Sequence, residues 1–73
     1  MFLKYLTQEG KVYVKQNAGT RKAIKIAFHN DSTYIGEVCN FQAPENYRQI
    51  KDDEFGNAMV KALQKIQQSR QRL

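Results

Sequence analysis

The feature that most constrains the fold is a change of hydrophobic period between residues 40 and 52. Before it, four short runs rich in β-branched and aromatic residues are separated by turn-forming residues at even spacing. These runs are 2–6, 12–14, 23–28 and 33–39. They predict four antiparallel strands joined as a meander, because short polar turns link strands that are adjacent in space.

After the change, apolar residues recur every three or four positions, which is typical of an amphipathic helix. The stripe consists of Phe55, Met59, Ala62, Leu63 and Ile66. Three acidic residues, 52–54, precede it where the helix dipole favours negative charge, and we expect Asp52 to be the N-cap. The basic Arg70 and Arg72 suit its far end. Pro44 is compatible with a further short helix over 44–50.

These patterns predict an α+β fold in the order ββββα, with one helix covering one face of the sheet. The chain of 73 residues forms one domain, with the sheet in 1–40 and the helical part in 44–72. A domain of this size has a small core, so we expect a stabilising partner or a homodimer. Val60 or Leu63 would meet the second copy if the apolar stripe is wider than the sheet can cover.

Alternation along the strands assigns side chains to faces. We expect the helix to cover a face made of Val12, Val14, Ile24, Ile26, Phe28, Tyr34, Gly36 and Val38. The opposite face then carries Lys11, Tyr13, Lys15, Lys25 and Ala27, with Ile35 and Cys39 nearby. The sequence therefore predicts an open face that is both cationic and aromatic.

The charge distribution favours an anionic partner. Twelve Lys and Arg against seven Asp and Glu give +5. Residues 1–36 hold six basic and two acidic groups, 37–60 hold two and five, and 61–73 hold four and none. Two basic segments, 1–36 and 61–73, thus flank an acidic segment, 37–60, which we call the acidic joint. Basic surfaces bind nucleic acid by releasing counterions from phosphates.

Nothing in the sequence assembles a catalytic site, so we expect a protein that is not an enzyme and needs no cofactor or metal. His29 is the one histidine and falls in a turn, and Cys39 has no second histidine with which to form a nucleophile–base pair. The acidic residues 52–54 suit capping better than metal binding. A secretory signal pattern and a membrane-length apolar run are both missing, which favours a cytoplasmic protein without membrane contact.

The best functional candidate is the predicted open face. Tyr13, flanked by Lys11 and Lys15 and next to Lys25, would let unpaired bases stack while lysines hold phosphates. Arg21 and Lys22 extend the positive field at the turn between the second and third strands, and Tyr5 offers a second ring. The interpretation is a small module that binds single-stranded DNA or RNA and has a regulatory role.

Residues 11–28 resemble the first hairpin of purine-rich-element-binding (PUR) repeats, through Val14-Lys15-Gln16-Asn17-Ala18 and Lys25-Ile26-Ala27. The ββββα order is shared with those repeats and with the related PC4-like single-stranded DNA binders. The resemblance implies binding of single-stranded DNA or RNA across the sheet, by a dimer or paired repeats. It also implies that Lys15, Gln16, Asn17 and Arg21 contact the nucleic acid.

Two other resemblances leave alternatives open. Ile24-Lys25-Ile26, Tyr34-Ile35-Gly36, Phe41 and Asn46 are similar to the first motif of Sm-like RNA-binding rings. The opening 2–6, the meander and the closing helix with Asn57-Ala58-Met59 resemble a small phage inhibitor of type I CRISPR complexes. The alternative function is accordingly a protein-interaction module, a phage-type inhibitor or regulator acting through the same face or through the acidic joint near Asp52.

Overall fold

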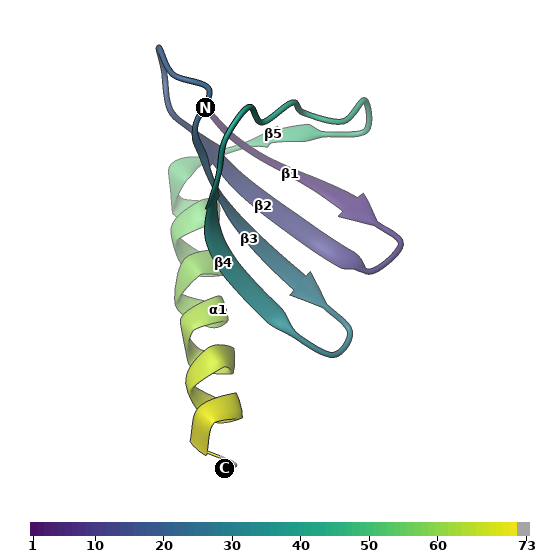
Figure 1. Ribbon diagram of the computed structural model, residues 1–73, viewed down its shortest axis with the longest axis vertical. Coiled ribbons are helices and arrows are strands. Elements are labelled where there is room, and N and C mark those ends of the chain that lie inside the picture. Colours follow the sequence, from purple (N-terminus) through teal and green to yellow (C-terminus); the bar gives the residue numbers. More distant parts are fainter. Residues whose placement is uncertain (72–73) are drawn as a thin grey trace.

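Five antiparallel strands form one sheet in the order β4-β3-β2-β1-β5, and a single C-terminal helix packs on it (Figure 1). The computed structural model describes residues 1–71. The elements are β1 Phe2–Thr7, β2 Gly10–Gln16, β3 Ala23–His29, β4 Thr33–Val38, β5 Arg48–Ile50 and α1 Asp52–Gln71. The predicted α+β fold, its four-strand meander and its C-terminal helix are confirmed. Arg72, expected at the end of the helical part, lies outside the described residues.

The fifth strand replaces the short helix predicted over 44–50, which is wrong. The Tyr47 N–H donates to the Pro44 carbonyl across 3.2 Å, which closes a turn. β5 then pairs antiparallel with the first half of β1, with Ile50 opposite Phe2 and Arg48 opposite Lys4. Pro44 therefore begins a turn, and a strand of three residues is too short to show alternation in the sequence.

α1 begins at Asp52, and its first turn is tied to the sheet. The Phe55 N–H donates to the Lys51 carbonyl at 3.3 Å, which places Asp52 inside the first turn and corrects its assignment as N-cap. An Asp53 carboxylate oxygen accepts the Glu54 N–H at 2.8 Å. Lys4 Nζ of β1 lies 2.8 Å from Glu54 Oε2. This ion pair orients the helix N-terminus over β1.

One core lies between the helix and the sheet. Ile26, Phe55, Ala58 and Ala62 are buried there. Half-buried apolar side chains surround them, namely Phe2, Tyr13, Ile24, Phe28, Ile35, Ile50 and Met59. The Phe2 and Phe55 ring centroids are 5.4 Å apart. The helical stripe Phe55, Met59 and Ala62 thus packs on the sheet as its spacing predicts.

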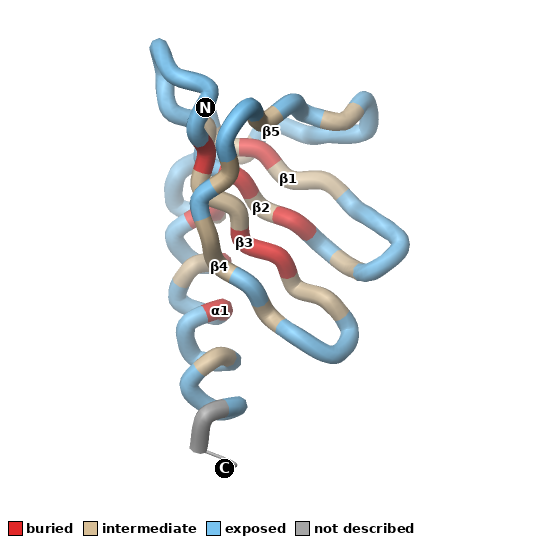
Figure 2. Tube along the Cα trace, viewed as in Figure 1, coloured by how far each residue is buried: buried red, intermediate tan, exposed pale blue. Residues whose placement is uncertain are grey.

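A second core lies on the opposite face of the sheet. Leu3, Val12, Val14, Ala23 and Ala27 are buried there, and Tyr5 and Phe41 pack against them. Buried positions consequently occur along β1, β2 and β3 (Figure 2). The segment 39–47 joins β4 at one edge of the sheet to β5 at the other, and it delivers Phe41 to this face. The Phe41 N–H donates to the Arg21 carbonyl at 3.2 Å.

The ladder register corrects the predicted faces. Tyr13 lies opposite Ile26, and Val12 lies opposite Ala27. Because directly opposed residues share a face, Tyr13 joins the helix side and Val12 joins the other side. The same rule moves Val14, Tyr34, Gly36 and Val38 away from the helix and moves Ile35 toward it. Only Ile24, Ile26 and Phe28 of the predicted covered face lie under α1.

Candidate nucleic-acid interface

The predicted binding residues do not share one surface. The first group lies on the helix side of β2, the second is Lys25 on the opposite face, and the third lies at or near the β2–β3 hairpin. The helix-side group is Lys11, Tyr13 and Lys15, and the hairpin group is Gln16, Asn17, Arg21 and Lys22. The prediction that Tyr13, Lys11, Lys15 and Lys25 share one open face of the sheet is therefore wrong.

The hairpin group is cationic and contains no aromatic residue. The N-terminal ammonium donates to the Gln16 carbonyl at 3.0 Å, which adds a positive charge at this end of the sheet. Both side chains are exposed. Residues 17–22 contain no aromatic side chain. Residues 17–22 can attract an anion, but they include no ring on which a base could stack.

A groove of about 550 Å³ lies on the helix side, between one flank of α1 and the sheet. Its floor is formed by Tyr13 of β2 and Phe28 of β3, whose rings meet edge to face at 5.8 Å between centroids. We call it the lysine groove. It is lined by Gly10, Lys11, Tyr13, Phe28, His29, Asn30, Glu54, Asn57, Ala58, Lys61 and Lys65. Residues of β2, of β3 and the turn that follows it, and of α1 therefore line one groove.

Two helix lysines reach over the floor of the lysine groove. Lys61 Nζ is 5.9 Å and Lys65 Nζ is 5.5 Å from the centroid of the Phe28 ring. At this distance each ammonium is attracted to the electron-rich face of the ring. The two residues are four apart on α1 and so lie on one flank. Phe28 thereby holds both ammonium groups at the groove.

The described part of the chain leaves the positive charge in the lysine groove without a neutralising carboxylate. Glu54 is the carboxylate in its lining, and it is paired with Lys4. At the rim, Glu9 Oε2 lies 3.7 Å from His29 Nε2. Among the described side chains, Lys11, Lys61 and Lys65 form no ion pair. Three ammonium groups converging on one concavity concentrate positive potential there.

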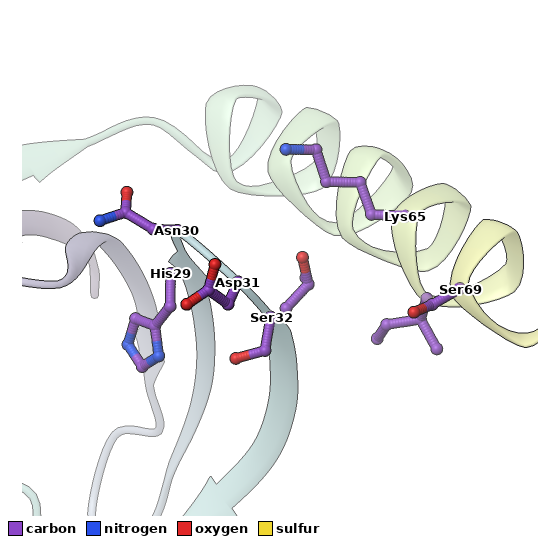
Figure 3. A pocket seen from close by; sticks show the side chains of 8 residues that line it. His29, Asn30, Asp31, Ser32, Lys65 and Ser69 are labelled. Atoms are coloured by element: carbon purple, nitrogen blue, oxygen red, sulfur yellow. The ribbon is translucent and has the colours of Figure 1, made fainter.

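The lysine groove continues toward the β3–β4 turn. An adjoining pocket of about 470 Å³ shares His29, Asn30 and Lys65 with it. Figure 3 shows the Lys65 side chain on α1 across from the side chains of the turn. Asp31 introduces one carboxylate here, beside the hydroxyls of Ser32, Thr33 and Ser69. The positive character of the groove therefore decreases toward this end.

In the other direction, a third pocket of about 370 Å³ shares Lys11 with the lysine groove. It opens where β1 extends beyond β5, and Asn46 Nδ2 donates to the Leu6 carbonyl there at 3.1 Å. Arg48 adds another cation. Tyr5 forms part of the wall, and burial raises the pKa of its hydroxyl. A track of cations thus runs from Arg48 through Lys11 to Lys61 and Lys65.

Sequence reasoning found Lys11 and Tyr13 but missed Phe28, Lys61 and Lys65 as site residues. Lys61 and Lys65 are four residues apart in the sequence, and this spacing places them on one flank of a helix. What the sequence did not contain was the crossing of α1 over β3, which brings that flank above Phe28. Cys39 is free and exposed, and the described residues contain no cluster of three potential metal ligands.

Comparisons with known proteins add no further indication. The chain matches no family model, and no curated protein and no solved structure was found to match it. In the described part of the chain, no helix is both long and apolar enough to cross a membrane.

Proposed function

We propose that this protein is a small non-enzymatic module that binds single-stranded DNA or RNA in the lysine groove. One observation carries the proposal: Lys11, Lys61 and Lys65, which form no ion pair with any described side chain, converge on a groove with an aromatic floor. Lysine ammonium groups bind the phosphates of nucleic acids and release their condensed counterions. The lysine groove thereby replaces the open sheet face as the binding surface.

Two properties favour a single strand over a duplex. The concavity of about 550 Å³ is lined by side chains that can contact a base as well as a phosphate, whereas the bases of a duplex are stacked on each other and offer no free face to it. Unpaired bases expose apolar faces, which can be buried against Tyr13 and the aliphatic stems of the lysines. The pocket at Lys11 and Arg48 gives the backbone a cationic continuation beyond the groove.

The test is a pair of double variants with equal charge change. Lys61→Gln with Lys65→Gln removes two charges from the lysine groove, and Arg21→Gln with Lys22→Gln removes two from the hairpin. All four side chains belong to exposed residues, so we expect both proteins to fold. Fluorescence anisotropy with a labelled single-stranded oligonucleotide measures affinity. We expect about a tenfold loss for the groove variant and less than about twofold for the hairpin variant.

The salt dependence of oligonucleotide binding tests the same two double variants in a second way. Each phosphate contact with a single strand contributes about 0.7 to the slope of log affinity against log salt. The groove variant should lower the steepness by about 1.4, and the hairpin variant should leave it unchanged. An equal loss for both variants would mean that affinity follows net charge alone. That result would refute the groove as the site.

A protein partner is the second candidate, favoured by the face opposite the helix. Tyr5, Val12, Ala27 and Tyr34 form one row across four strands, and the Tyr34 residue is 49% exposed. Tyrosines are frequent anchors of protein interfaces. A protein partner retained after nuclease treatment by the native chain, but not by Tyr34→Ala, would favour this candidate.

A further inference from the structure

The outer edge of β4 is open. β4 ends the strand order, and β3 is its one strand partner among the described residues. An edge strand presents unpaired backbone N–H and C=O groups that can pair with another strand. Glu37 is the single charged residue of β4. This edge thus has few of the charges by which natural sheets prevent edge-to-edge association.

α1 packs against β4 and carries apolar side chains that the sheet does not cover. Ile35 of β4 and Met59 of α1 are half-buried in the core under the helix, while Val60 and Leu63 are 56% and 48% exposed. At about 100° per residue, Val60 and Leu63 lie on the flank of α1 that faces away from Lys61 and Lys65. α1 therefore carries its cations on one flank and exposed apolar side chains on the other.

We propose that two copies of this chain associate through β4, pairing the strands antiparallel about a two-fold axis perpendicular to the sheet. In such a pairing a residue on the axis lies opposite its own copy. Opposed residues share a face, so both helices lie on the same side of one continuous sheet. The two apolar flanks, with Val60 and Leu63, then face each other across the seam.

Charge favours this edge over the lysine groove as the surface on which a second copy can pack. With the axis at Ile35, Glu37 of one copy lies opposite Thr33 of the other copy. With the axis at Gly36, Glu37 of one copy lies opposite Ile35 of the other copy. Neither register brings like charges into direct opposition. Symmetric contact through the lysine groove would instead oppose two sets of Lys11, Lys61 and Lys65. The β4 dimer leaves both grooves open on its outer flanks.

Sedimentation equilibrium tests the association. We expect the native chain to reach twice its monomer mass as concentration rises, and Val60→Glu with Leu63→Glu to remain monomeric. Both positions are exposed, and glutamate is a better helix former than valine, so the variant should fold. Leu6→Glu is the control, because Leu6 is 63% exposed and far from β4 in the strand order. It should dimerise like the native chain.

The single cysteine reports the register. Cys39 is free and exposed, directly after β4. With the axis at Ile35 or Gly36, the two Cys39 Cα atoms are separated by about 20 to 27 Å along the strands. A spin label on Cys39 should give one dipolar distance near that range, extended by the label arms. A monomer at every concentration, a dimer that survives the double glutamate variant, or a distance far outside this range would overturn the proposal.

Discussion

The rings of Tyr13 and Phe28 meet edge to face beneath α1, with centroids 5.8 Å apart and planes at 90°. This contact joins β2 to β3 and forms the floor of the lysine groove. The edge of one ring therefore packs on the face of the other, and these two ring surfaces are not free to contact a ligand. Tyr13 is therefore part of a packed groove floor and not a free stacking platform.

Tyr13→Ala should consequently destabilise the fold. The half-buried ring packs in the core under the helix, so we expect the free energy of unfolding to fall by about 1–3 kcal/mol. Urea unfolding followed by circular dichroism measures it. Tyr34→Ala, at an exposed position on the opposite face, should cost less than about 1 kcal/mol. Equal losses of unfolding free energy in the two variants would mean that the Tyr13 side chain contributes no more to packing than the exposed Tyr34 side chain.

Two glycine substitutions should change stability in opposite directions. Gly10 has φ +150°, and a Cβ there would collide with the backbone carbonyl of Phe28, so Gly10→Ala should cost at least about 2 kcal/mol. Gly56 lies in α1, and a Cβ there would meet no atom within 4 Å. Gly56→Ala should stabilise by about 0.5–1 kcal/mol. Thermal unfolding compares the two, and a loss at Gly56 would contradict the open helix surface.

The core opposite the helix should contribute as much as the core beneath it. Leu3 is fully buried there. We expect Leu3→Ala to lower the free energy of unfolding by about 2–5 kcal/mol, as truncation in a packed core does. The exposed neighbour provides the control, since Leu6→Ala should cost less than about 1 kcal/mol. A small effect at Leu3, measured by chemical unfolding, would show that this face is an open surface.

Tyr5 should make stability fall at alkaline pH. Burial raises the pKa of its hydroxyl above the ordinary value of about 10, because the charged phenolate is poorly solvated in the folded state. Below that ordinary pKa both states are protonated. Above it the unfolded chain loses the proton first, so the free energy of unfolding decreases as pH rises toward the folded-state pKa.

Urea unfolding between pH 9 and pH 11 measures this decrease, with Tyr5→Phe as the comparison. The variant cannot ionise at position 5, so its stability should fall less steeply over the same range. Identical slopes for the two proteins would show that the Tyr5 hydroxyl is as well solvated in the folded state as in the unfolded chain.

The strands and the long helix could be predicted because period and turn chemistry are local signals. β3 illustrates this, since Ile24, Ile26 and Phe28 alternate with smaller or charged residues. β2 is different, because Val12 and Val14 on one face and Tyr13 on the other are all suitable for burial. The pairing of Tyr13 with Ile26 decides which side chains of β2 lie under the helix, and the local sequence of β2 does not contain this pairing.

The second core and the lysine groove depend on the same kind of relationship. Leu3 and Val14 are buried opposite the helix, and Phe41 of the connection between β4 and β5 packs against this core. Lys61 and Lys65 become site residues because α1 crosses β3 above Phe28. Helical spacing predicts which side chains share a flank, but the direction in which a helix crosses a sheet is set by packing.

The most direct test of the lysine groove is a titration of the ¹⁵N-labelled protein with a short single-stranded oligonucleotide, followed by amide chemical shifts. The account predicts that the largest shifts lie in Lys11, Phe28, Lys61 and Lys65, with residues 17–22 nearly unchanged. Shifts concentrated in residues 17–22, or around Tyr34 and Gly36, would contradict it.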